Sequence, residues 1–169
     1  IHDDHEDDGR LAFRAPARWT TTATNGSGLQ QGDPTTVTWS IVPDGGQSNL
    51  IARLDAIYGG GTGALSARPW FPVLSSAFNI WTTQSGLKFV YEAADDNATM
   101  SNSSPGVLGT RGDMRINGAD IDGNYGILGY AYLPNYGDIT IDTNDVFYAD
   151  TSSNSIGLRN VLAHEIGHA

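Results

Sequence analysis

Alternating and periodic apolar positions divide this chain into five expected strands and three expected helices. The run Thr35–Val42 alternates and is rich in β-branched residues, which is typical of a strand. Four later runs share this character: Leu87–Glu92, Asp113–Ile116, Gly126–Leu133 and Asp138–Asp142. Apolar residues recur at helical spacing over 49–58, over 69–84 and from about Ser155 to the end of the chain. Because strands and helices are interleaved, we expect an α/β layer arrangement over one sheet.

The last expected helix carries the most informative motif. Its apolar stripe repeats every four residues, at Leu158, Leu162 and Ile166. Asn154 or Ser155 is suited to cap its N-terminus. Residues 164–168 have the pattern H-E-x-x-H, which places two imidazoles one turn apart so that both can face one metal ion. The alternative is a helix with two surface histidines. Gly167 lies inside the motif, where a larger residue could crowd a neighbour.

A glycine-rich acidic block lies upstream of this helix. Asp122 and Gly123 open a turn whose carbonyls can face inward, and three aspartates follow at short intervals: Asp138, Asp142 and Asp145. Hard oxygen donors grouped on turns suit Ca²⁺, whereas carboxylates packed together without a cation repel one another. The spacing alone is equally compatible with a calcium site and with solvated turn residues.

Composition narrows the class of protein. The 169 residues suffice for one domain, and the lack of cysteine excludes disulfides, thiolate zinc sites and a cysteine latency switch. A formal charge of −10, with Lys88 as the single lysine, argues against nucleic acid as a partner. No apolar run is long enough for a membrane span, and no signal peptide is apparent. An acidic surface suits a secreted protein in calcium-containing surroundings, although simple solubility is the more economical explanation.

Residues 1–18 precede any apolar periodicity and form an acidic tail that contains His2 and His5. A charge run of this kind is usually a solvated tail. The alternative is a metal-binding arm, because the two histidines lie among several carboxylates. The folded domain is therefore expected to cover residues 19–169.

These motifs together resemble a known family. Residues 164–168 resemble the start of the metzincin zinc motif, H-E-x-x-H-x-x-G-x-x-H, and residues 122–134 are similar to the calcium loop and edge strand of the matrixins, or matrix metalloproteinases. The resemblance implies the upper, N-terminal subdomain of that α/β fold, which some schemes class as α+β. It implies a five-stranded, twisted, mixed sheet with an antiparallel edge strand, and two long helices that include the zinc-binding helix.

The resemblance also assigns roles to individual residues. The implied zinc ligands are His164 and His168, and the implied catalytic base is Glu165. The implied ligands of one calcium ion are Asp122, Asp142 and Asp145, with Gly123 contributing through its backbone. A second implied calcium site uses Asp113 and Asp138. Backbone groups of the edge strand would bind an extended peptide at Leu128 and Gly129.

Departures from the family pattern affect the expected function. Tyr130 and Thr140 stand where two histidines of a structural zinc site would be, so we expect no structural zinc. The third zinc histidine would lie six residues after His168, beyond Ala169. With two protein ligands a metal would be weakly held. We therefore expect this chain to be inactive, or nearly so, unless another segment completes the site.

The sequence thus predicts a secreted, zinc-dependent endopeptidase that acts on protein or peptide substrates. A C-terminal segment beyond Ala169, or less readily the His2 and His5 tail of a neighbouring molecule, would complete its metal site. The rival prediction is a calcium-stabilised, non-catalytic binding or surface module that keeps the same fold.

Overall fold

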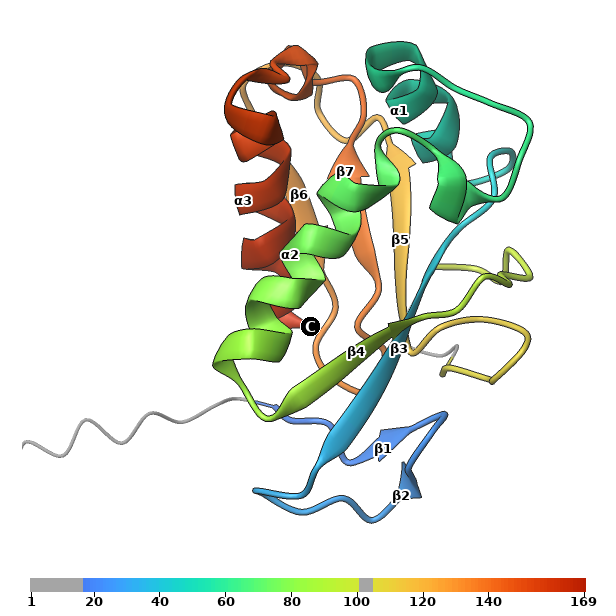
Figure 1. Cartoon of the computed structure of the whole chain (residues 1–169), viewed down its shortest axis with the longest axis vertical. Helices are drawn as coiled ribbons and strands as arrows, with labels where there is room; N and C mark the ends of the chain where they lie inside the picture. Colours follow the sequence, from blue (N-terminus) through green and yellow to red (C-terminus); the bar gives the residue numbers. More distant parts are fainter. Residues whose placement is uncertain (1–16, 101–104) are drawn as a thin grey trace, which may run out of the picture.

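A five-stranded mixed sheet forms the centre of the molecule (Figure 1). The computed structural model describes residues 17–100 and 105–169. The strands are β3 (Thr35–Ile41), β4 (Leu87–Tyr91), β5 (Met114–Ala119), β6 (Gly129–Ala131) and β7 (Ile139–Asp142). Their order is β4-β3-β5-β7-β6, and all neighbours are parallel except β6, which runs antiparallel to β7 at the edge. The expected mixed sheet with an antiparallel edge strand is confirmed.

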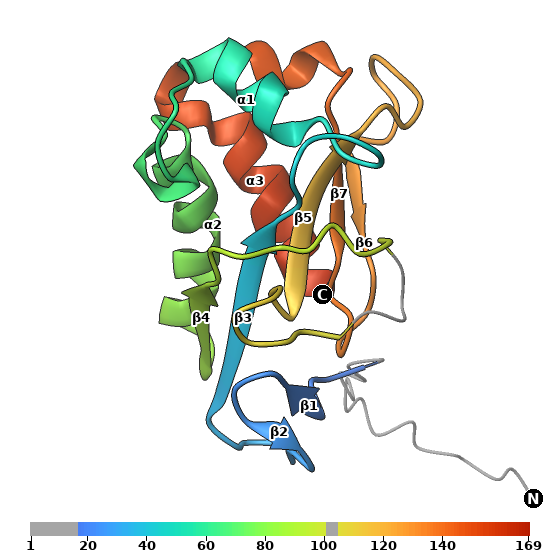
Figure 2. The same ribbon diagram turned by 90° about the vertical axis from the view of Figure 1, so that its right-hand side faces the viewer.

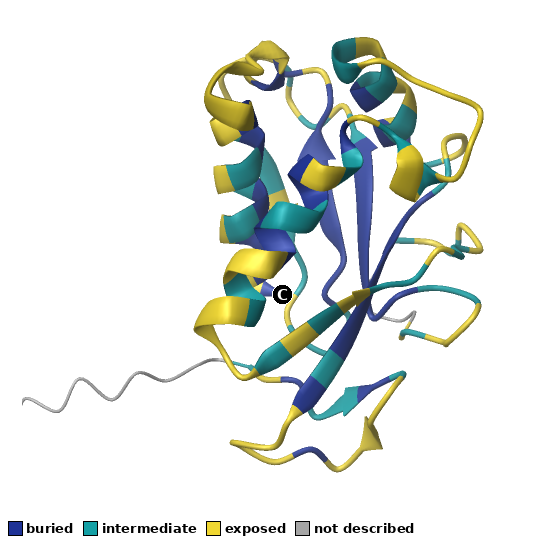
Figure 3. Cartoon of the chain, viewed as in Figure 1, coloured by how far each residue is buried: buried dark blue, intermediate teal, exposed yellow. Residues whose placement is uncertain are grey.

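Helices α2 (Phe71–Gln84) and α3 (Ser152–His168) lie across one face of the sheet, and α1 (Leu50–Tyr58) packs against the end of β5 (Figure 2). Alternate strand residues point toward these helices, because successive side chains of a strand face opposite sides. Trp39 of β3 stacks on Phe78 of α2, with ring centroids 4.3 Å apart. The buried apolar side chains form one core cluster between the sheet and the helices. Figure 3 colours the ribbon dark blue where residues are buried, along the central strands and the inner sides of the helices.

The opposite face of the sheet is polar and also buried. Its residues are 0–4 % exposed: Thr38, Ser40, Arg115, Asn117, Asp138 and Thr140. The segment between β4 and β5, described over 92–100 and 105–113, crosses this face on the side away from α2 and α3 (Figure 2). The sheet is therefore covered on both faces, by apolar helices on one and by a polar segment on the other.

Local features differ from the sequence-based expectations. Strand β6 is shorter than the expected Gly126–Leu133, because the residues before it form a loop that bonds to nearby carboxylates. The residues Ser153, Asn154 and Ser155 have φ of 50°, 57° and 54°, so the regular helix begins after them and the expected N-cap is wrong. A small hairpin of β1 (Thr21–Thr22) and β2 (Gly26–Ser27) was not expected.

Short 3₁₀ turns complete the described chain at η1 (Leu65–Ala67) and η2 (Val146–Ala149). Helix α2 begins at Phe71 rather than Pro69, with a proline in its first turn, where the missing N–H has no intrahelical partner to lose. Across the described residues, no helix is long and apolar enough to cross a membrane.

Candidate metal and peptide site

The two motif histidines converge on one face of α3. The Nε2 atoms of His164 and His168 lie 3.0 Å apart, both side chains are exposed, and their rings meet edge to face. Two nitrogens bound to one tetrahedral zinc at about 2.0–2.1 Å would lie about 3.3 Å apart. The pair therefore fits zinc as two of its ligands. Among residues 17–100 and 105–169, no three His, Cys, Asp or Glu side chains are grouped so that they could hold one metal ion.

Glu165 lies beside this pair and is only 7 % exposed. Burial raises the pKa of its carboxyl, while the neighbouring charges of His164 and His168 oppose that rise. A partly desolvated carboxylate in this position can accept a proton from a water molecule.

Helix α3 is fixed by its apolar stripe and by α2. Leu158, Leu162 and Ile166 are 2 %, 0 % and 4 % exposed, as their spacing predicted. The Trp81 Nε1 of α2 donates a 2.7 Å hydrogen bond to the Ala163 carbonyl, next to the first motif histidine. A Cβ added to Gly167 would lie 2.5 Å from Trp81 Cζ2, so the absence of a side chain at Gly167 lets α2 pack closely.

The edge strand β6 lies beside the motif helix. A Cβ added to Gly129 would be 3.6 Å from Val161 Cγ1 of α3, one turn before His164. The Leu128 carbonyl points into the sheet, where it accepts hydrogen bonds from Asp142 N at 2.9 Å and from the Tyr148 hydroxyl. At the other end of the ladder, Tyr132 N donates to Asp138 O.

Paired positions alternate along an antiparallel ladder. Because Leu128 and Tyr132 bond toward β7, the backbone groups that point away from the sheet belong to Gly129 and Ala131. The expected peptide contact at Gly129 stays a prediction, whereas the Leu128 carbonyl is already used within the fold. Neither Ala131 nor Tyr148 was singled out from the sequence, since their roles depend on strand register.

The acidic block closes around the loop that precedes β6. The Asp142 Oδ2 accepts hydrogen bonds from Asp122 N and Gly123 N, both at 3.2 Å. The Asp145 Oδ2 accepts one from Tyr125 N at 2.8 Å, and the Asp122 carboxylate accepts one from Ile127 N at 3.0 Å. Three carboxylates thus hold one short loop through its backbone amides.

Two of these carboxylates, Asp142 and Asp145, are fully buried. Burial raises the pKa of Asp142, but backbone hydrogen bonds from Asp122 and its neighbours outweigh that effect and hold the pKa below its usual value. Across the described ranges, no lysine, arginine or histidine forms an ion pair with the three aspartates. Buried carboxylates bonded only to neutral amides leave negative charge uncompensated. In the described residues, however, these carboxylates are not drawn together into one metal-binding group.

Asp113 and Asp138, the second expected calcium pair, have separate partners. The Asp113 carboxylate accepts hydrogen bonds from Ala23 N at 2.6 Å and from Thr38 N and Oγ1, both at 2.8 Å. Asp138 lies 3.5 Å from the Arg115 Nη1. The acidic tail with His2 and His5 lies outside the described residues, apart from its last two positions.

Comparison with known families agrees with this geometry. A family model described as Matrixin matches residues 62–169, which include the acidic block, the edge strand and the whole H-E-x-x-H helix. The chain therefore belongs to the matrixin family, a class of metalloproteases that use zinc. No curated protein matches the chain.

Proposed function

We propose that this protein is a zinc-dependent endopeptidase whose motif helix supplies two zinc ligands and the catalytic base. The observation that carries the proposal is the 3.0 Å approach of His164 Nε2 to His168 Nε2, with Glu165 buried beside them. When bound, zinc supplies Lewis-acid chemistry that polarises a peptide carbonyl and acidifies water. Glu165 would accept a proton from that water and pass it to the leaving amine.

The substrate would be an extended peptide that lies along β6. The outward backbone groups of Gly129 and Ala131 offer hydrogen bonds to such a strand, and α3 lies alongside, with Val161 close to Gly129. A peptide bound there would pass close to Glu165, because Val161 is one helical turn before it.

Calcium would bind at the acidic loop through Asp122, Asp142 and Asp145, with the Gly123 backbone nearby. Its charge would offset the buried carboxylates, and its role would be to fix the loop that leads into β6. A secreted location agrees with such a site, since extracellular calcium is plentiful enough to fill weak sites.

A third zinc ligand would come from a polypeptide segment outside residues 1–169. An apolar groove of about 890 Å³ opens at the end of α3, where Trp81, Phe89, Ile166 and His168 line it. A following segment seated in this groove would pass next to the two motif histidines. With only two ligands, the chain by itself would hold zinc weakly and cleave slowly or not at all.

The test is peptidase activity of the longer gene product, compared with its Glu165→Ala variant. We expect the variant to lose activity by about 10²–10⁴-fold, the range for loss of a general base. Equal activity in the two proteins would refute the proteolytic function.

A second candidate is a calcium-stabilised binding module without catalysis, and the buried carboxylates that hold the loop before β6 are the observation in its favour. Metal analysis separates the candidates. About one tightly bound zinc per longer molecule supports the peptidase, whereas calcium without zinc supports the binding module.

A further inference from the structure

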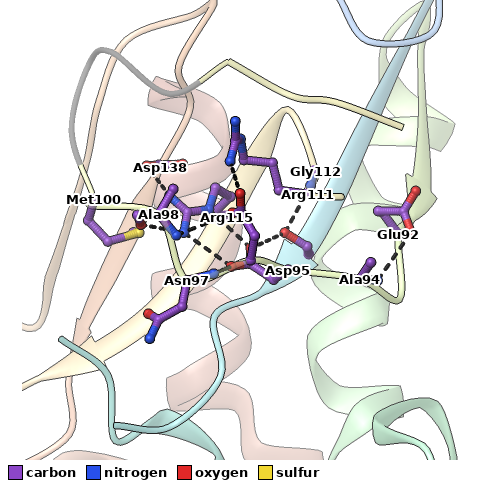
Figure 4. A network of polar contacts seen from close by, with 12 residues as sticks. Glu92, Ala94, Asp95, Asn97, Ala98, Met100, Arg111, Gly112, Arg115 and Asp138 are labelled. Carbon is purple, nitrogen blue, oxygen red and sulfur yellow. Dashed lines mark hydrogen bonds and ion pairs between the residues drawn. The ribbon is translucent and has the colours of Figure 1, made fainter. Parts of the chain in front are cut away.

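A buried ion network lies on the sheet face away from the helices (Figure 4). Arg115 of β5 is fully buried, and its guanidinium binds Asp95 with two hydrogen bonds, of 3.0 Å from Nε and 3.1 Å from Nη2. The Nη2 also donates to the Ala98 carbonyl at 2.7 Å. Asp95 and Ala98 belong to the segment that crosses the sheet between β4 and β5.

The same guanidinium faces Asp138 on the neighbouring strand. The register pairs Ile116 with Ile139, so Arg115 and Asp138 are side by side on the polar face. The Nη1 of Arg115 lies 3.5 Å from Asp138 Oδ2, and both side chains are 0 % exposed. Arg115 is therefore a buried cation shared between a carboxylate of the sheet and a carboxylate of the crossing segment.

The crossing segment has further attachments that keep Asp95 in place. The Ser40 hydroxyl of β3 donates to Asp95 Oδ2 at 2.7 Å and accepts from Gly112 N at 3.0 Å. The Gln47 side chain holds residues 98–100 of the crossing segment. It donates to the Ala98 carbonyl at 2.7 Å and accepts from Met100 N at 2.8 Å. The guanidinium thus lies within a polar network that joins β3, β5 and the crossing segment, and its charge occupies the position between Asp95 and Asp138.

The Asp113 carboxylate is held by hydrogen bonds from backbone and hydroxyl donors. Its two carboxylate oxygens accept three hydrogen bonds from Ala23 and Thr38. Asp113 and Asp138 precede neighbouring strands, but in the described residues they do not belong to a group of three or more His, Cys, Asp or Glu side chains that could hold one metal ion. Asp113 and Asp138 together therefore do not provide the oxygen ligands that a second calcium ion would need.

We propose that Arg115 takes the place of a metal cation on this face, so that the protein has one calcium site, at the acidic loop, and none at Asp113 and Asp138. The guanidinium balances Asp95 and Asp138 and fastens the crossing segment to the sheet. A fixed protein cation makes this half of the fold independent of free calcium. The other half, with Asp142 and Asp145, stays dependent on it.

The first experiment counts calcium by equilibrium dialysis of the chain and of its Asp142→Asn and Asp138→Asn variants. We expect one calcium in the unaltered chain, none in Asp142→Asn and one in Asp138→Asn. Two calcium ions in the unaltered chain, with one lost in Asp138→Asn, would overturn the proposal. If the unaltered chain binds none, the acidic-loop site of the proposed function is refuted, and the second experiment decides the role of Arg115.

The second experiment removes the cation. Arg115→Ala leaves two buried carboxylates facing a vacated volume, so we expect the variant to melt at a lower temperature and to regain stability when calcium is added. The control is Arg111→Ala, which removes an ion pair with Asp96 on the same segment, where the Asp96 side chain is 39 % exposed. Added calcium should raise the melting temperature of this control no more than it raises that of the unaltered chain. An Arg115→Ala protein whose melting temperature shows no added calcium dependence contradicts the proposal. If that variant does not fold with or without calcium, the dialysis count decides alone.

Discussion

Gly167→Ala should test how closely α2 must pack against the metal-binding helix. The added Cβ would lie 2.5 Å from Trp81 Cζ2 and 3.0 Å from Cη2, both shorter than a van der Waals contact. The indole cannot swing aside freely, because its Nε1 is bonded to the Ala163 carbonyl. Either the two helices move apart or this hydrogen bond breaks.

The magnitude follows from three opposing effects. Overpacking a filled site costs about 1–3 kcal/mol, and loss of the indole hydrogen bond adds about 1 kcal/mol. Replacing glycine by alanine inside a helix returns about 1 kcal/mol. The net loss in the free energy of unfolding is therefore about 1–3 kcal/mol, which for a domain of this size lowers the melting temperature by about 2–12 °C.

Gly157→Ala is the matched control in the same helix. Its added Cβ meets Phe147 at 3.0 Å, but Phe147 is 42 % exposed and its ring can move into solvent. We expect this variant to be neutral or more stable by up to about 1 kcal/mol from helix propensity alone. Urea unfolding followed by far-UV circular dichroism compares the two. A Gly167→Ala protein as stable as the Gly157→Ala protein would show that the Trp81 contact does not constrain the helices.

The remaining predictions address single contacts. Trp81→Phe keeps an aromatic ring but loses the donor to the Ala163 carbonyl, so urea unfolding should show a loss of about 1–2 kcal/mol. Unchanged stability would contradict the role of that bond. Chelation of calcium should lower the melting temperature of the unaltered chain but not of Asp142→Asn, as scanning fluorimetry can check. Arg111→Gln should return the pKa of Asp96 toward its usual value, because the Arg111 hydrogen bond is the largest cause of its lowering. The Asp96 pairing stabilises the fold above the unfolded-state pKa and is lost as pH falls through the folded-state pKa, and carboxyl NMR titration can follow that change.

Much of the fold could be predicted because the relevant signals are local. The stripe Leu158, Leu162 and Ile166 defined the buried side of α3 by its spacing alone, and all three residues are buried as expected. The H-E-x-x-H pattern placed two imidazoles on one helical face for the same reason. The family match over 62–169 agrees with what the motif and acidic block indicated.

The start of α3 and the length of β6 were not predicted correctly from the sequence. Asn154 and Ser155 have the composition of a helix cap, yet they adopt left-handed backbone conformations before the helix begins. The apolar run that suggested a strand from Gly126 begins instead in a loop, because buried carboxylates bind its backbone amides. In the loop before β6, tertiary hydrogen bonds therefore outweighed local preference.

The sequence by itself predicted the five strands of the main sheet and the three helices, the motif helix among them. Only the tertiary structure decided which carboxylate has which partner. Arg115 is one charged residue in a short strand, and its position beside Asp138 follows from strand register, while its bond to Asp95 follows from the path of a segment across the sheet. Periodicity records which side of an element is buried. It carries no information about which distant residue lies opposite, and that long-range pairing separates Asp138, balanced by a guanidinium, from Asp142, held by amides alone.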